Sequence, residues 1–80
     1  DAEAEVIEAQ VMSTSPIAGS LIGNIDFPEG VIVGGILKNG DMVKPSSQSK
    51  IEEGDIIALF ALSKDIPEVE RLLQVTIDYF

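Results

Sequence analysis

The chain contains no cysteine and no histidine, and only 5 of its 80 residues are basic. Without cysteine there is no disulfide framework and no thiolate metal site, and without histidine the usual ligand of zinc, iron and copper is missing as well. A nucleophilic enzyme would have to depend on serine–lysine neighbours, and Ser49–Lys50 and Ser63–Lys64 both lie in polar turn sequences. We therefore expect no catalytic residue and no enzyme activity in this chain.

Basic residues are also few relative to acidic ones, since 14 acidic residues give the chain a net charge of -9. Such a charge repels a phosphate backbone, so nucleic acid is not an expected partner. No apolar stretch approaches the roughly 20 residues that span a bilayer, and the acidic start DAEAEVIEAQ is unlike a signal peptide. We expect a soluble domain, and because it does not begin with Met we expect a further portion upstream of Asp1.

The size of the chain allows one domain, residues 1–80, with a marginal core. A domain of this length buries only about 60% of the surface that its unfolded chain exposes. The sequence is nevertheless 45% apolar, which is more than one small core easily hides. Association with a second copy would bury the excess.

Several segments have the pattern of β-strands. Asn39–Gly40 lies between two of them, and this pair favours a two-residue hairpin turn because both central residues of a type I′ turn need φ > 0. Pro45 ends the hairpin, and Glu53-Gly54-Asp55 forms a turn before the next strand. The predicted strands are Glu5 to Met12, Val31 to Leu37, Met42 to Lys44 and Ile56 to Leu62.

Two segments have helical patterns. Ser15 is suited to an N-cap and Pro16 to the first helical position, so we predict a short helix over about Pro16 to Ile22. Asp65 followed three residues later by Glu68 fits a capping box. An apolar helical stripe follows it at Ile66, Val69, Leu72 and Leu73.

These elements predict an α+β fold, a small β-sheet with a β-hairpin and two helices on one face, in the order β-α-β-β-β-α. The terminal segment Val75 to Phe80 alternates and would add a last strand or an extended tail. The runs VIVGGIL and IIALFAL are apolar on both faces of the sheet, so helices on one face leave the other uncovered. A second copy would cover it, or else the tail of a monomer would fold over it.

This reasoning predicts a homodimer interface within the two apolar strands. Adjacent residues of a strand point to opposite faces, so one of Ile32 and Val33, and one of Ile56 and Ile57, would face the partner. The sequence alone does not say which. The interface candidates are Ile32, Val33, Gly34, Gly35, Ile56 and Ile57.

The sequence motifs give little support for a ligand-binding site. Glu52, Glu53 and Asp55 are weak candidates for a divalent cation, but they lack the spacing of a calcium loop, and turn chemistry alone explains them. The glycines at 30, 34 and 35 match neither the dinucleotide nor the P-loop fingerprint, so we expect no cofactor in this domain.

The sequence resembles the TrkA-C domain, the C-terminal half of RCK (regulator of potassium conductance) proteins. The likeness runs through PEG and VIVGGILKNGDMVKP, then IEEGDIIALFAL, then DIPEVERLL, and so covers nearly the whole chain. The ending ERLLQVTIDYF is similar to the C-terminal end of the cytoplasmic subunits of Trk-type potassium uptake systems, which implies that Phe80 is a natural end.

The resemblance implies a regulatory domain in potassium uptake that dimerises and modulates gating of a membrane potassium channel subunit. It implies a cytoplasmic location, peripheral on the inner face of the cell membrane. It also implies an adjoining Rossmann-type nucleotide-binding half, and NAD(H) or ATP would bind there. The same domain appended to another membrane transporter is an alternative.

A further alternative is a sensor domain that binds a cation or nucleotide in the dimer cleft. Some TrkA-C domains bind cyclic di-AMP at their dimer interface, using an arginine near the first hairpin strand. This chain has no Lys or Arg from Ile17 to Leu37, so that anion lacks its expected partner. Related channels are activated by calcium through sets of carboxylates, and we can match no such set to this chain residue by residue.

Overall fold

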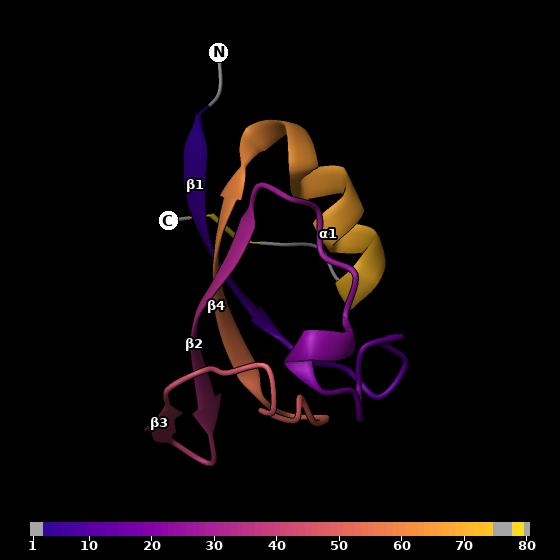
Figure 1. The fold of residues 1–80 in the computed structure, drawn as a ribbon, viewed down its shortest axis with the longest axis vertical. Coiled ribbons are helices and arrows are strands. Elements are labelled where there is room, and N and C mark those ends of the chain that lie inside the picture. The colour runs from indigo at the N-terminus through magenta and orange to yellow at the C-terminus, as the bar shows by residue number, and fades with distance from the viewer. Residues whose placement is uncertain (1–2, 75–77, 80) are drawn as a thin grey trace.

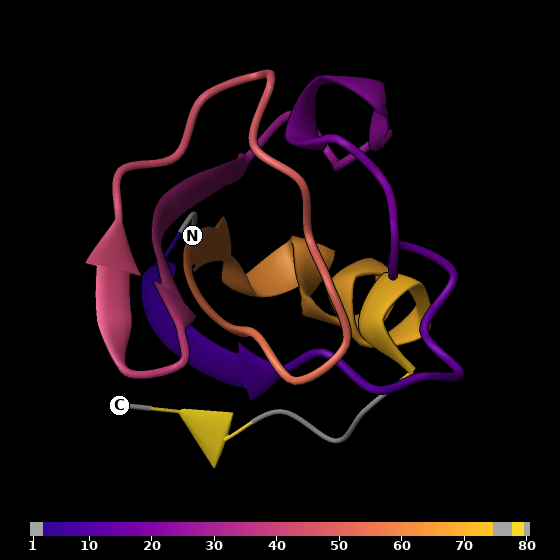
Figure 2. The same cartoon turned by 90° about the horizontal axis from the view of Figure 1, so that it is seen from below.

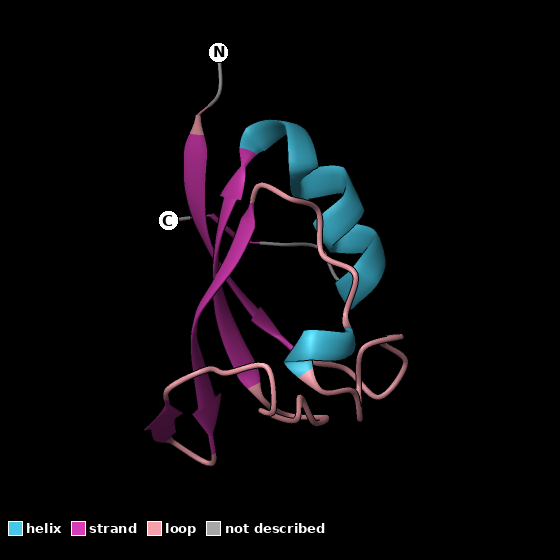
Figure 3. Ribbon diagram, in the orientation of Figure 1, coloured by secondary structure: helices cyan, strands magenta, loops and turns pink. Residues whose placement is uncertain are grey.

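The apolar and alternating segments form one antiparallel sheet in the computed structural model, which describes residues 3–74 and 78–79. Its strands lie in the order β3-β2-β4-β1-β5, and the α-helix covers one face (Figures 1 and 3). The α+β class is therefore confirmed. The elements are β1 (Ala4–Gln10), η1 (Ile22–Asn24), β2 (Val31–Lys38), β3 (Asp41–Val43), β4 (Ile56–Leu62), η2 (Ser63–Asp65), α1 (Ile66–Leu73) and β5 (Asp78–Tyr79), with η denoting a 3-10 helix.

Each predicted strand is present, with ends shifted by two residues or fewer. The two-residue strand β5 adds to the sheet beside Ile7 and Glu8 of β1. Of the predicted terminal segment, residues 75–77 and residue 80 lie outside the described residues. In the hairpin, Lys38 pairs with Asp41, and Asn39 and Gly40 turn with φ of +52° and +84°. These are the values of the two-residue type I′ turn that Asn-Gly favours.

The prediction of a helix over about Pro16 to Ile22 is wrong, because the structure has no α-helix there. One turn forms, but Gly19 then takes φ +89°, which leaves the helical region. From there the main chain forms hydrogen bonds with residues 47–51: the N–H of Gly19 donates to the carbonyl of Ile51, and the N–H of Ile51 donates to the carbonyl of Ser20. A ladder between two loops has replaced the helical bonds, and only the short η1 follows.

The second helix, α1, forms where the sequence predicts it, but its capping box does not. Asp65 occupies the N-cap position and makes no side-chain bond to the helix. The reason is η2, which leaves Asp65 with φ -96° and ψ -5° instead of the extended conformation of a capping residue. Glu68, the other half of the predicted box, receives its bonds from Arg71.

The core lies between α1 and the face of the sheet that α1 covers, which we call the inner face. Figure 1 shows the loop of residues 11–25 near the C-terminal end of α1, and Figure 2 shows the same arrangement from below. The Ser15 hydroxyl donates to the Leu72 carbonyl at 3.1 Å. That bond satisfies a carbonyl in the last turn of the helix, where no helical partner is available. The buried apolar side chains are Ile7, Ala9, Ile36, Ile57, Leu59 and Ala61 from the sheet, Ile66, Val69 and Leu73 from α1, and Val11, Ile17 and Ile51 from the loops.

Gly30 lies against the start of α1, and we expect Gly30→Ala to destabilise the domain by about 1–3 kcal/mol. A Cβ there would come within 2.6 Å of Asp65 Oδ2 and 2.8 Å of Leu62 Cδ1, so both side chains would have to move. Urea denaturation measures the effect, with Glu29→Ala at the exposed neighbouring position as the control. An unchanged midpoint for Gly30→Ala would show that the loop shifts freely away from the helix.

Candidate functional site

The second face of the sheet, which we call the outer face, carries four of the five large exposed apolar side chains of the described residues, and the fifth, Met12, follows β1. The strand register places Val6, Phe60 and Ile32 side by side across β1, β4 and β2. Their exposed fractions are 40%, 47% and 65%, and that of Met42 on β3 is 69%. Monomeric soluble proteins rarely leave a contiguous apolar patch of this kind without a use.

The structure decides which residue of each predicted pair belongs to the outer face. Ile57 is fully buried in the core, and Val33 packs against the same core. These two candidates face α1 and leave the set of interface candidates. Because neighbouring residues of a strand point in opposite directions, Ile32 and Ile56 lie on the outer face.

Gly34 and Gly35 form a β-bulge in the middle of this face, since the pairing of β2 with β4 shifts between Val33 and Gly35. The Phe60 ring lies over Gly34, where an added Cβ would come within 2.7 Å of Cε2. The Met42 sulfur lies over Gly35, where the corresponding distance is 3.1 Å. The two glycines therefore let Phe60 and Met42 lie close to the sheet.

On the outer face, the positions of β2 and β4 are all apolar or glycine and carry no charge. A charge lies on the neighbouring strand β1, where the alternation brings Glu8 outward beside Ala58. This matters in a chain of net charge -9, because two copies that met through β2 and β4 would not place carboxylates of these two strands against one another.

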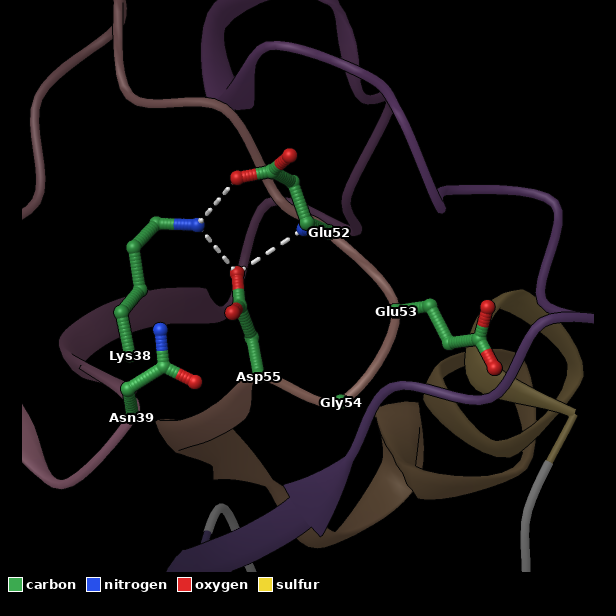
Figure 4. Close-up of a pocket in the computed structure, with 6 residues that line it drawn as sticks. All are labelled: Lys38, Asn39, Glu52, Glu53, Gly54 and Asp55. Atoms are coloured by element: carbon green, nitrogen blue, oxygen red, sulfur yellow. Dashed lines mark hydrogen bonds and ion pairs between the residues drawn. The ribbon is translucent and has the colours of Figure 1, made fainter.

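A polar cavity of about 260 Å³ lies at one end of the sheet, lined by Lys38, Asn39, Glu52, Glu53, Gly54 and Asp55 (Figure 4). The Lys38 Nζ donates to Asp55 Oδ2 at 2.5 Å and to Glu52 Oε1 at 3.1 Å. The Asp55 oxygen also accepts from the Glu52 N–H at 2.8 Å. We call this arrangement the Lys38 clamp, because it ties the base of the hairpin to the turn before β4.

The turn itself is held by its main chain. Gly54 has φ +90°, and the N–H of Asp55 donates to the carbonyl of Glu52. Val11 bonds the turn from the other side, accepting from Gly54 and donating to Asp55, both at 2.8 Å. Asp55 is consequently only 6% exposed, and its carboxylate has to find partners inside the protein.

The clamp pairs two of the three carboxylates of this turn with a lysine. An ammonium group already lies between Glu52 and Asp55, and Figure 4 shows the Glu53 carboxylate directed away from them. In the described part of the chain no group of three or more Asp, Glu, His or Cys residues could hold a metal. The arrangement thus acts as a structural contact between two loops.

The clamp should make stability depend on alkaline pH. The hydrogen bond that Lys38 donates to the Asp55 carboxylate is the main cause that raises the Lys38 pKa above its ordinary 10.5. A raised pKa means that the folded state binds this proton more tightly, so the contribution is complete below 10.5 and is lost as pH rises through the higher folded value. The midpoints of urea denaturation of the wild type and of Lys38→Met should therefore differ by a constant amount up to about pH 10, and the difference should shrink above it. A difference that does not shrink as the pH is raised progressively above 10.5 would contradict this.

The chain matches the family model of the TrkA-C domain over residues 6–74. It belongs to the TrkA-C domain family. The Trk system potassium uptake protein TrkA of Azorhizobium caulinodans is 36% identical over the whole chain, and the protein of the same name from Haemophilus influenzae is 39% identical over 88% of it. The chain spans only 18% and 16% of those two proteins.

The fold of this TrkA-C domain is also found among solved structures. One, described as "RCK domain with cda", superposes with a TM-score of 0.75 over 86% of this chain and 97% of that one. The two sequences are 17% identical, so the likeness concerns the fold. No helix in the described residues of our domain is long and apolar enough to cross a membrane.

Two contacts of the TrkA-C domain could not be located from the sequence. The sequence shows a lysine before the hairpin turn and a carboxylate in the E-x-G-D turn, but not that they bond across 17 residues. It also does not show that Gly30 makes room for Asp65, whose Oδ2 is buried without a hydrogen-bond partner among the described residues. In both cases the partner comes from a distant segment, so no local pattern marks it.

Proposed function

We propose that this domain is a regulatory and assembly module of the cytoplasmic subunit of a Trk-type potassium uptake system, and that it acts by pairing with a second copy through the outer face. The observation that carries the proposal is the uncharged row of Val6, Phe60 and Ile32, exposed in a domain whose relatives are potassium uptake proteins. A chain this short gains little stability from its own core, so a buried outer face would add substantially.

The mechanism we propose is indirect. A Rossmann-type half adjoining this domain would bind NAD(H) or ATP, and the change it undergoes would be passed through the paired TrkA-C domains to a membrane potassium channel subunit. The domain would thus be a non-catalytic part of a cytoplasmic assembly, peripheral on the inner face of the cell membrane.

A second candidate is a sensor that binds a small ligand between the paired domains. One observation favours it: the structural neighbour is described together with "cda". Against a nucleotide, no Lys or Arg occurs from Ile17 to Leu37, so the first strand of the hairpin and the loop before it supply no cationic side chain. Titration calorimetry with cyclic di-AMP, NADH and calcium separates the two candidates, since a pure assembly module should bind none of them.

The proposal predicts that Ile32→Asp yields a folded monomer. Ile32 is 65% exposed in the isolated chain, so an aspartate there is solvated in the monomer, but two of them would be buried near the two-fold axis of a dimer. Sedimentation equilibrium at micromolar concentration should give twice the chain mass for the wild type and the single mass for the variant. The circular dichroism spectrum should be unchanged.

The control variant is Glu29→Lys, an exposed change of charge outside the outer face. It should leave the dimer intact. In the full-length protein, Ile32→Asp should impair potassium uptake at low external potassium, and Glu29→Lys should not. A wild-type domain that sediments as a monomer would overturn the proposal, as would normal uptake by a verified monomeric variant.

A further inference from the structure

The Asn39–Gly40 turn contains the residue pair that most favours spontaneous loss of an asparagine amide. In this reaction the main-chain nitrogen of the following residue attacks the side-chain Cγ, the Cγ–Nδ2 bond breaks, and ammonia leaves a succinimide ring. Water then adds to one ring carbonyl and breaks its bond to nitrogen, which gives aspartate or, with one extra main-chain carbon, isoaspartate. Glycine leaves the attacking nitrogen unhindered. The other asparagine of the chain, Asn24, precedes the β-branched Ile25.

The intact turn keeps the reacting atoms apart. Ring closure needs the Gly40 nitrogen on the same side of the Cα–C bond as Cβ. Asn39 has φ +52°, in the left-handed region where ψ is roughly +30 to +60°. At such ψ values the next nitrogen lies on the far side from Cβ. Asn39 is exposed and so meets water freely, but it can react only after the turn has opened.

The hairpin lies at one edge of the sheet, where opening costs less than in the core. Its second strand, β3, has three residues at the edge of the sheet and pairs with β2 only at Ile36, Leu37 and Lys38. Met42 in the middle of β3 is 69% exposed. Short edge elements with few buried contacts open more often than the core. β2 is held by its pairing with β4, and at the base of the turn the Lys38 clamp adds a contact between the end of β2 and the turn before β4.

We propose that Asn39 is a deamidation site gated by opening of the β2–β3 hairpin, and that the Lys38 clamp limits the rate. The product cannot return to the original turn. Isoaspartate lengthens the main chain of a two-residue turn, and either product adds a carboxylate to a cavity already lined by Glu52 and Asp55. Met42 then loses its fixed place over Gly35 on the outer face. The reaction itself does not depend on the proposed function.

The test measures isoaspartate and aspartate formation at both asparagines by peptide mapping, during incubation at mildly alkaline pH. The samples are the folded chain, Lys38→Met, and a peptide of residues 34–45 that represents the open turn. We expect the peptide to react at least about tenfold faster than the folded chain, and Lys38→Met about three- to tenfold faster, since loss of the clamp raises the open population. Asn24 should change little in every sample.

Two controls separate local opening from global unfolding. Lys64→Met removes an exposed ion pair with Asp65 and should react at the wild-type rate. Ser15→Ala weakens the contact to α1 without touching the hairpin, so it should lower the denaturation midpoint and leave the Asn39 rate unchanged. Equal rates in the peptide and the folded chain would overturn the proposal. So would equal rates in Lys38→Met and wild type, or an acceleration by Ser15→Ala as large as that of Lys38→Met.

Discussion

Ile57→Asp should unfold the domain, with a loss of more than about 4 kcal/mol. Ile57 is fully buried, and on the inner face of the sheet it lies between Ala9 and Ile36. The residues that pair with it are apolar, and the only cation on its two neighbouring strands, Lys38 at the end of β2, is already paired with Asp55 and Glu52. The loss is large against the 5–15 kcal/mol typical of a whole domain. Circular dichroism and urea denaturation should show an unfolded chain at neutral pH.

Ile57→Val is the matched control, because it keeps an apolar side chain and should cost only about 0.5–1.5 kcal/mol. The informative contrast is with Ile32→Asp, the same kind of change on the outer face, which should leave the domain folded. If both aspartate variants unfold, the outer face is essential to the monomer itself. If both fold, the assignment of the two faces is wrong.

The two faces of the sheet show how much of the fold sequence patterns can predict. The runs VIVGGIL and IIALFAL identify two strands, and alternation separates Ile32 from Val33 and Ile56 from Ile57. Choosing the inner residue of each pair requires the position of α1 and the bulge at Gly34, which shifts the alternation of β2 by one residue. Both depend on contacts between distant segments, so the sequence leaves the choice open.

The segment from Ser15 to Ser20 shows where local helix propensity does not decide the structure. Ser15 and Pro16 do start a turn, and Ile17 is buried as an apolar helical position would be. The chain departs from a helix because residues 47–51 offer main-chain partners to Gly19 and Ser20, and because Gly19 adopts a positive φ easily. A short helix has little stability of its own, so tertiary hydrogen bonds decide the outcome.

The sequence predicts only one part of the Lys38 clamp, the turn that carries the carboxylates. Glu52, Glu53 and Asp55 were recognisable as a carboxylate-rich turn, and a turn with a solvated surface was one interpretation of it. What could not be read is that Asp55 is buried and accepts two hydrogen bonds. Its burial follows from Val11, which pairs with the turn from the end of β1.

Asp55→Ala should destabilise the domain by about 2–4 kcal/mol, more than any other change within the clamp. The substitution removes the acceptor of two hydrogen bonds, one from the Lys38 ammonium and one from the Glu52 N–H. The N–H group would remain in the turn without this partner, and Lys38 would retain only the exposed carboxylate of Glu52. Urea denaturation of the purified domain at neutral pH measures the loss.

The other members of the clamp should rank below Asp55 in a defined order. Lys38→Met leaves the buried carboxylate with the N–H of Glu52 alone, so its loss should be intermediate. Glu52→Ala should cost less than about 1 kcal/mol, because that side chain is 58% exposed and water replaces its ion pair. A double-mutant cycle between Lys38→Met and Asp55→Ala should show that the two losses are not additive, since both remove the same ion pair. Additive losses would mean that the ion pair contributes nothing, and that Asp55 stabilises the domain only through the turn.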